Sequence, residues 1–464
     1  MKFINIKLIY LFLIFSFCIT DTVSEPLDTI ENINTTIEVQ EDATIEVVND
    51  ENNYVFELPY KHTYLKFEDC NEYLGSKNEV YCIQGAFISD SINFNGSITN
   101  IEFFEDDLYV VLKNGKIVKY NILDNTSEEV FNISNNVRQR GMENGLLDIA
   151  ISQFDSQFVI SYVNLENKLI FELFEYEKDI RKSRSLGILL EIESESDSHY
   201  GGKVIWSENY NCFIGSIGDL QEASFESRIR SDSLDTTKVS GKIIGLNCDS
   251  LNIETDIISK SETKPLQNLI ATGLRNPWQF FEFKDFLVVF DTGFTQNEEL
   301  NISKFDNKTK NFGWPVFEAT KRSEDLDNIE NYSLDISHWI NDQQKSALQF
   351  IYENSVKPSF YYNHHACESP QFENCDGNSK IYRAAIIGGG ILNNPSSSYN
   401  FDIFFADHIS QELFSFNLID GSVKIFPIDN LLYVNVVKVF DDKLNKVMVG
   451  TDKGQLHIIQ LPKS

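Results

Sequence analysis

Four short stretches of this chain carry residue types that could do chemistry. His199 precedes two glycines, Arg275 and Asn276 precede a proline, and Asp291 and Glu299 come before an Asn-x-Gly-Trp-Pro turn. A neutral imidazole can take up a proton near pH 7, and a guanidinium can stabilise negative charge. Carboxylates beside glycine-rich turns supply the oxygen ligands that calcium prefers. The pattern predicts a polar site that combines a base, a cation and a candidate metal position.

The size and composition of the chain predict a folded, strand-rich protein. Its 464 residues are 42% apolar, which is enough for a large core. It contains 36 Phe and 19 Tyr but only 3 Met, and aromatic residues favour pleated, half-buried surfaces. The formal net charge of -31 would repel a polyanion, so we expect neither nucleic acid nor an anionic lipid surface as a partner.

Strand-like runs alternate with turn residues from residue 87 onward. One predicted hairpin spans residues 106–122, with Asn114 and Gly115 at its turn, and similar pairs recur to the end of the chain. Repeated antiparallel meanders predict an all-β fold, specifically a six-bladed β-propeller of four-stranded blades at roughly 60 residues per blade. We assign this propeller to residues 61–464. A large β-sandwich or two all-β domains are the alternatives.

The N-terminal 60 residues differ from the rest of the chain. Residues 1–20 resemble a secretory signal peptide, because two lysines precede the apolar run from Leu8 to Ile19. An uncleaved membrane anchor is the alternative, since this segment is only slightly short for a span. Residues 21–60 contain no Lys or Arg, which predicts a flexible acidic tether or, alternatively, an acidic binding tail. We therefore expect an exported protein, whether periplasmic, secreted or otherwise extracellular.

Cysteine usage agrees with export. Six cysteines remain after the predicted cleavage, and an even number in an exported chain favours disulfides. The nearest-neighbour pairing, one of several connectivities, joins Cys70 to Cys82, Cys212 to Cys248 and Cys367 to Cys375.

Nine short motifs, in register, resemble the glucose/sorbosone dehydrogenase family over about residues 90–464. They begin at Gly141, His199, Gly218, Gly241, Gly273, Asp291, Glu298, Asn311 and Ile387. The resemblance implies a six-bladed propeller, and its soluble quinoprotein members bind pyrroloquinoline quinone (PQQ) with calcium and oxidise aldoses. Hedgehog-interacting and related proteins use the same fold for binding, so the fold alone does not decide the activity.

The resemblance also implies roles for individual residues. His199 corresponds to the catalytic base of the family, and Asp219 to the aspartate that pairs with that base. Arg275 and Asn276 correspond to the pair that contacts the quinone oxygens, where a cation would stabilise the charge that builds as hydride arrives. Glu143 lies where the family has a substrate-lining Gln or Glu.

Asp291 and Glu299 fall in the region that holds calcium in the family. Roles unrelated to catalysis or binding remain as alternatives for six of these seven residues. They are a structural histidine at His199, a turn aspartate at Asp219, a blade-joining arginine at Arg275, and ordinary surface carboxylates at Glu143, Asp291 and Glu299.

The last third of the chain departs from the family. Soluble quinoprotein members hold the PQQ carboxylates with a lysine and two arginines, and the corresponding positions here are Ile409, Tyr433 and Asn435. Losing these cations would remove charge-assisted hydrogen bonds worth about 1.5–3 kcal/mol each. The alternative cations nearby are Lys438, His408 and Arg383.

Two functions of different class therefore follow from the sequence. The first is an exported PQQ-dependent dehydrogenase that oxidises an aldose or a related sugar and passes electrons to an external acceptor. The second is a non-catalytic extracellular binding propeller that has lost PQQ. The retained His, Asp, Arg and Asn favour the first function, and the missing cations favour the second.

Overall fold

The computed structural model describes residues 63–65, 76–77 and 80–462, except for 105–106, 123, 142, 153, 195, 221–230, 250, 252, 255–264, 295–296, 320, 323–352, 364–382 and 442. The predicted signal peptide, the acidic tether, Cys70, Cys367 and Cys375 lie outside the described residues. No helix within the described ranges is long and apolar enough to cross a membrane.

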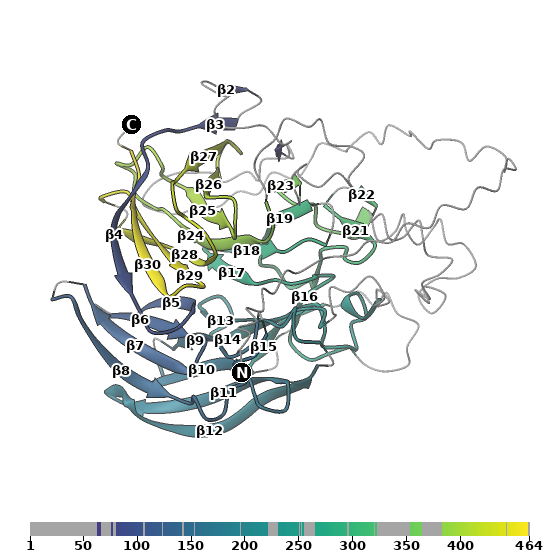
Figure 1. Ribbon diagram of the computed structural model, residues 1–464. Coiled ribbons are helices and arrows are strands. Elements are labelled where there is room, and N and C mark those ends of the chain that lie inside the picture. The colour runs from purple at the N-terminus through teal and green to yellow at the C-terminus, as the bar shows by residue number, and fades with distance from the viewer. Residues whose placement is uncertain are drawn as a thin grey trace, which may run out of the picture. The chain divides into compact units, whose positions relative to one another are not determined.

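Six four-stranded antiparallel blades make up the structure, which confirms the predicted all-β propeller (Figure 1). Blades 1 to 3 contain β5 (Ile98–Phe104), β6 (Asp107–Leu112), β7 (Lys116–Asn121), β8 (Thr126–Asn132), β9 (Leu146–Ile151), β10 (Gln157–Val163), β11 (Lys168–Glu177), β12 (Asp179–Glu193), β13 (Gly201–Ser207), β14 (Cys212–Ile217), β15 (Lys242–Leu246) and β16 (Leu269–Thr272). Blades 4 to 6 contain β17 (Gln279–Phe283), β18 (Phe286–Asp291), β19 (Asn297–Lys304), β23 (Phe360–Asn363), β24 (Ile386–Ile391), β25 (Asp402–Asp407), β26 (Glu412–Asn417), β27 (Val423–Pro427), β28 (Val434–Asp441), β29 (Lys446–Thr451), β30 (Gln455–Gln460) and β4 (Phe87–Asn93).

Short elements extend this framework. Three segments add parallel strands to the outer edges of blades 3, 4 and 5: β20 (Lys310–Asn311) on β16, β1 (Thr63–Leu65) on β23, and β3 (Val80–Cys82) on β27. The remaining elements are β2 (Ser76–Lys77) beside β3, the hairpin of β21 (Phe317–Glu318) and β22 (Lys321–Arg322), and a 3-10 turn at Ser231–Ser233.

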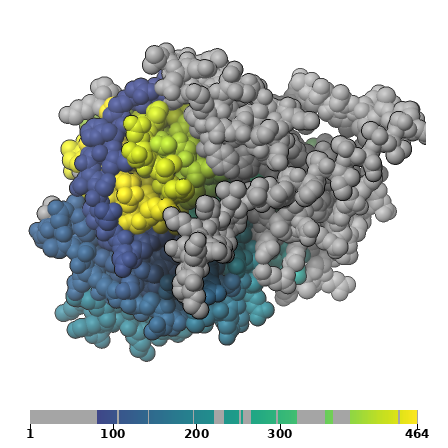
Figure 2. Space-filling model, viewed as in Figure 1, coloured from purple at the N-terminus to yellow at the C-terminus, as the bar shows by residue number. Residues whose placement is uncertain are grey.

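The ring is closed by a strand from the other end of the chain. The inner strands β5, β9, β13, β17, β24 and β28 contact one another in cyclic order. Blade 6 takes its outer strand β4 from the N-terminal side of the propeller, and β4 pairs antiparallel with β30, so that Ile92 lies opposite Leu456. Figure 2 shows this purple N-terminal segment lying against the yellow C-terminal strands. Closure leaves no inner strand without neighbours on both sides.

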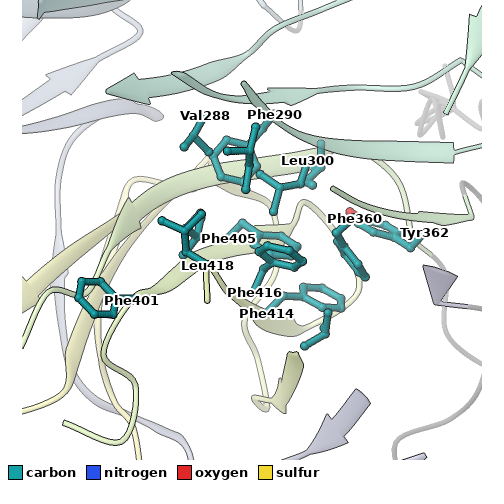
Figure 3. Close-up of a cluster of buried hydrophobic side chains, with 14 of the residues drawn as sticks. Val288, Phe290, Leu300, Phe360, Tyr362, Phe401, Phe405, Phe414, Phe416 and Leu418 are labelled. Atoms are coloured by element: carbon teal, nitrogen blue, oxygen red, sulfur yellow. The ribbon is translucent and has the colours of Figure 1, made fainter. Parts of the chain in front are cut away.

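Aromatic side chains fill the space between blades. Between blades 4 and 5, Phe290 of β18 meets Phe405 of β25, and Phe405 stacks on Phe414 of β26 with ring centroids 5.3 Å apart (Figure 3). Both faces of these strands are buried, because each blade packs between two others. The buried strands are therefore almost continuously apolar instead of alternating.

The blade topology gathers polar segments on one face of the ring. In an antiparallel four-stranded blade, the start of the first strand and the connection between the second and third strands lie at the same end. We call this end of the ring the loop face. His199 precedes β13, Arg275 precedes β17, Asp219 follows β14, and Asp291 ends β18. The predicted site residues are thus brought to the loop face by topology alone.

One predicted disulfide is confirmed. Cys212 at the start of β14 is bonded to Cys248, which follows β15, and the two Cα atoms are 5.1 Å apart. Cys82 is also disulfide-bonded.

The close contact of Gly388 with Phe290 predicts a packing defect on substitution. A methyl group at Gly388 would lie 1.9 Å from the nearest ring atom of Phe290, whereas one at Gly390 would have no atom closer than 3.7 Å. We expect Gly388→Ala to lower the free energy of unfolding by about 1–3 kcal/mol through overpacking, measured by urea denaturation. Gly390→Ala is the matched control in the same strand. Equal effects of the two substitutions would contradict this packing account.

Candidate active site

His199 and Asp219 form a buried pair. The imidazole Nδ1 lies 2.8 Å from Asp219 Oδ1, and its Nε2 lies 3.0 Å from Nη2 of Arg275. A guanidinium can only donate hydrogen bonds, so Nε2 must be the acceptor and Nδ1 must carry the proton that Asp219 accepts. These contacts fix one neutral tautomer of His199, with its lone pair on Nε2. The pairing predicted for His199 and Asp219 is present in the structure.

The segment around Asp219 approaches His199 so closely that glycine is required. A Cβ on Gly218 would lie 2.0 Å from the carbonyl oxygen of His199. His199 itself has φ of 57°, in the left-handed region that few residues other than glycine adopt. Local strain of this kind persists only where the surrounding structure imposes it.

Asp219 is held by more than the imidazole. Its backbone N–H donates to the Arg275 carbonyl over 2.7 Å, and its Oδ2 accepts the indole N–H of Trp314 over 3.0 Å. Its two carboxylate oxygens therefore serve two different side-chain donors. Only a carboxylate offers two acceptor atoms in this geometry.

Arg275 is fixed by carbonyl groups and aromatic rings. Its Nη1 donates to the carbonyl oxygens of Thr292 (3.0 Å) and Gly293 (2.6 Å). Its guanidinium carbon lies 5.3 Å from the ring centroid of Phe294 and 5.7 Å from that of Trp314. Cation–π contacts of this kind hold a cation without neutralising it. Arg275 therefore faces His199 with its positive charge intact.

Asn276 joins Glu143 to the same site. Asn276 Nδ2 donates to Glu143 Oε1 over 3.2 Å, and its Oδ1 accepts the N–H of Gly201 over 3.1 Å. Glu143 Oε2 accepts the N–H of Tyr200, also at 3.2 Å. Glu143 is partly buried and lies next to the segment that carries His199.

Asp291 and Glu299 are buried and lie directly opposite each other on β18 and β19. Asp291 accepts the backbone N–H groups of Arg275 and Asn276, at 2.9 and 2.7 Å. Glu299 accepts the N–H of Ala319 and, over 3.1 Å, the side-chain amide of Asn301. Burial raises the pKa of Asp291 to about 7, and burial together with Asp291 raises the pKa of Glu299 to about 8.

A family model for glucose/sorbosone dehydrogenases matches residues 98–374, which is more than half of the chain. The chain belongs to the glucose/sorbosone dehydrogenase family. No curated protein matches it.

Solved structures of this family share the fold. The soluble aldose sugar dehydrogenase of Escherichia coli, in its apo-form, is 15% identical with a TM-score of 0.55, over 81% of this chain and 99% of that one. A putative oxidoreductase (glucose dehydrogenase) of Thermus thermophilus is 14% identical with a TM-score of 0.53, over 82% of this chain and 99% of that one. At these identities the similarity establishes the propeller fold.

The positions where soluble quinoprotein members of the family carry cations lie on the loop face. Ile409 is in the connection between β25 and β26, and Tyr433 and Asn435 are at the start of β28. Tyr433 is 41% exposed, and Asn435 Nδ2 donates to the carbonyl of Ile98 over 3.1 Å. Lys453 lies above the Tyr433 ring, with its Nζ 4.9 Å from the centroid. This exposed lysine is a cation that sequence alignment alone did not assign.

The alternative cations named from the sequence are engaged elsewhere. Arg383 is buried and makes two hydrogen bonds to Glu412, at 2.8 and 2.9 Å. Lys438 pairs with Glu102 at 3.2 Å, and His408 Nδ1 bonds to the carbonyl of Val434 over 2.7 Å. Arg275 and Asn276 both contact the segment of His199, and their side-chain N–H groups are donors of the kind that the quinone oxygens of a tricarboxylate such as PQQ would accept. The carboxylate end offers fewer cations than in the soluble quinoprotein members.

The donor set beside Asp291 and Glu299 suits a hard cation. Besides the two carboxyl groups, Asn301 has a buried side-chain oxygen that accepts no hydrogen bond. Calcium prefers such carboxylate and amide oxygens. Within the described ranges, no three His, Cys, Asp or Glu side chains converge as a metal-binding group, so a bound calcium would also need amide or backbone oxygens.

Sequence reasoning missed the part that Trp314 plays. Trp314 is not among the predicted site residues, yet its indole N–H donates to Asp219. The signal available was the motif itself, because the N–H of a buried Trp usually finds a hydrogen-bond acceptor.

The two donors on Asp219 predict a stability loss for Asp219→Asn. Asparagine has one side-chain oxygen, so either Trp314 or His199 would keep a buried N–H without an acceptor. We expect the free energy of unfolding to fall by about 1–3 kcal/mol, measured by chemical denaturation. Asp155→Asn, in the exposed turn between β9 and β10, is the control. An equally small loss in both variants would refute the two-donor arrangement.

The raised pKa values of Asp291 and Glu299 predict that stability falls as pH rises. Their carboxyl groups titrate at about 7 and about 8 in the folded state, against ordinary values of 3.8 and 4.5. Between these limits the folded state binds more protons than the unfolded state. In EDTA, we expect the free energy of unfolding to fall from about pH 4.5 to about pH 8, by at most about 1.4 kcal/mol per pH unit for each group.

Glu299→Gln removes one of the two titrating groups and should flatten this dependence. Glu177→Gln, at an exposed position on β11, should leave it unchanged. A Glu299→Gln protein with the wild-type pH dependence would show that Glu299 is ionised throughout this range.

Proposed function

We propose that the chain is an exported dehydrogenase that oxidises an aldose or a related sugar alcohol or hemiacetal, with PQQ as hydride acceptor. The observation that carries this proposal is the fixed tautomer of His199, whose lone pair on Nε2 lies beside Arg275. Family membership supports the same reaction class. The apolar segment after Lys2 and Lys7 supports export.

His199 is the base in this proposal. Its Nε2 would take the proton of the sugar hydroxyl, while the carbon that bears this hydroxyl would lose a hydride to the acceptor. The sugar thus loses two electrons and two hydrogens and becomes a lactone or carbonyl product. Asp219 would stabilise the imidazolium that results, as a carboxylate does when it accepts the other N–H of a histidine. Because Arg275 Nη2 contacts Nε2 without a substrate, the sugar hydroxyl must take the place of that contact.

Arg275 and Asn276 would hold the quinone oxygens of PQQ, which when bound supplies an ortho-quinone as the two-electron acceptor. Arg275 suits this role because its guanidinium donates to backbone carbonyls and His199 and not to a carboxylate. Its charge can then stabilise the negative charge that develops during hydride transfer. Glu143 would line the sugar site, and Asp291 and Glu299 would bind calcium.

A non-catalytic binding propeller is the second candidate. It is favoured by the uncharged side chains at Ile409, Tyr433 and Asn435. The pairing of Arg383 with Glu412 and of Lys438 with Glu102 favours it too, because each of these cations already has a carboxylate partner.

Titration of the mature protein with PQQ and calcium tests the proposal. We expect saturable PQQ binding that is stronger with calcium, and reduction of a dye acceptor with at least one aldose. His199→Ala should keep PQQ binding and lose about a hundredfold or more of turnover, since general bases contribute about this much. Absence of binding at micromolar PQQ would favour the binding propeller. Equal turnover in wild type and His199→Ala would remove His199 as the base.

A further inference from the structure

We propose that Trp314 is a positioning residue for His199, and that it acts through its indole N–H. The inference rests on the proposed function for its catalytic consequence, but its structural part can be tested without substrate or cofactor. Trp314 contacts both neighbours of the imidazole, so that Trp314, Asp219, His199 and Arg275 form a closed cycle of interactions.

The first arm of the cycle runs through Asp219. The indole Nε1–H donates to Asp219 Oδ2 over 3.0 Å, while Oδ1 lies 2.8 Å from His199 Nδ1. A carboxylate bound at one oxygen could rotate and still meet the imidazole. With the indole on the second oxygen, rotation would break a buried hydrogen bond, so the plane of the carboxylate is set.

The second arm runs through Arg275. The ring of Trp314 lies under its guanidinium, with 5.7 Å between the guanidinium carbon and the ring centroid, and Phe294 lies at 5.3 Å. The guanidinium therefore points Nη2 at His199 Nε2, 3.0 Å away. One indole thus orients the groups on both nitrogens of the imidazole.

Backbone contacts explain why Trp314 can do this reliably. The N–H of Trp314 donates to the carbonyl of Gly273 over 2.9 Å, and the N–H of Phe312 donates to the carbonyl of Thr272, also over 2.9 Å. The Asn-x-Gly-Trp-Pro turn is therefore fastened to the segment that leads into Arg275. Trp314 is only 5% exposed, so its indole has no room to reorient.

Packing and positioning roles make different demands on Trp314. A residue that only packs the turn needs an aromatic ring, whereas a positioning residue needs the N–H donor as well. Trp314→Phe keeps an aromatic ring and removes the donor, so it separates the two roles. Trp206→Phe is the matched control, since Trp206 lies at the far end of β13, away from the site, and packs against Phe213 with ring centroids 4.9 Å apart.

The readout is the imidazole Nδ1–H resonance of His199 in protein labelled with nitrogen-15 at histidine. The wild-type resonance is identified by its loss in His199→Ala. We expect Trp314→Phe to shift or broaden this resonance and to lower kcat about tenfold, with the KM for sugar changed by no more than about twofold. Trp206→Phe should leave all three quantities unchanged. A wild-type His199 resonance in folded Trp314→Phe would overturn the proposal.

A second measurement does not depend on the folding of Trp314→Phe. In wild type the indole N–H resonance of Trp314 reports its bond to Asp219, and we expect Asp219→Ala, which removes both acceptor oxygens, to move it while the other three of the four tryptophans stay in place. An unmoved Trp314 resonance would also overturn the proposal. A wild type that oxidises no sugar would refute the proposed function, and the resonances would still decide whether Trp314 positions His199.

Discussion

The pairing of β4 with β30 closes the propeller. It joins residues 87–93 to 455–460 and turns six sheets into a closed ring, in which every inner strand has a neighbour on each side. Without closure, blades 1 and 6 would each expose an apolar face, and the loop face would not be a continuous surface. Aromatic packing between blades, as between Phe290 and Phe405, then makes the ring rigid enough to hold polar residues at defined distances.

The basic residues within this ring differ in the kind of group that holds them. Several basic residues within it are neutralised by a carboxylate from another blade or strand: Lys203 by Asp148, Lys438 by Glu102 and Arg383 by Glu412. Such carboxylate partners offset part of the desolvation free energy of a buried charge. Arg275 differs, because carbonyl groups, aromatic rings and a histidine hold it in place. Among the described residues no carboxylate is hydrogen-bonded to the Arg275 guanidinium, so its charge can stabilise a ligand anion or developing negative charge.

The buried carboxyl groups of the site have raised pKa values, and backbone N–H groups offset only part of the cost of burying them. Asp291 and Glu299 lie opposite each other, and their pKa values are raised to about 7 and about 8 because water is excluded. Backbone N–H groups of Arg275 and Asn276 offset part of the cost at Asp291. This part of the molecule is costly for stability, as polar sites assembled for binding or catalysis often are. Asp291 thereby ties the segment of Arg275 to blade 4.

The strand pattern, the all-β class and the order of the motifs could be read from the sequence, because turn residues and apolar runs are local signals. The resemblance carried by those motifs also pointed to His199, Asp219, Arg275 and Asn276, which the structure brings together. The contacts of each polar group, in contrast, depend on how distant segments fold together. Trp314 donates to Asp219, which is 95 residues away, and Arg383 pairs with Glu412. No local pattern encodes such pairs, since they form where separate loops meet on one face of a closed ring.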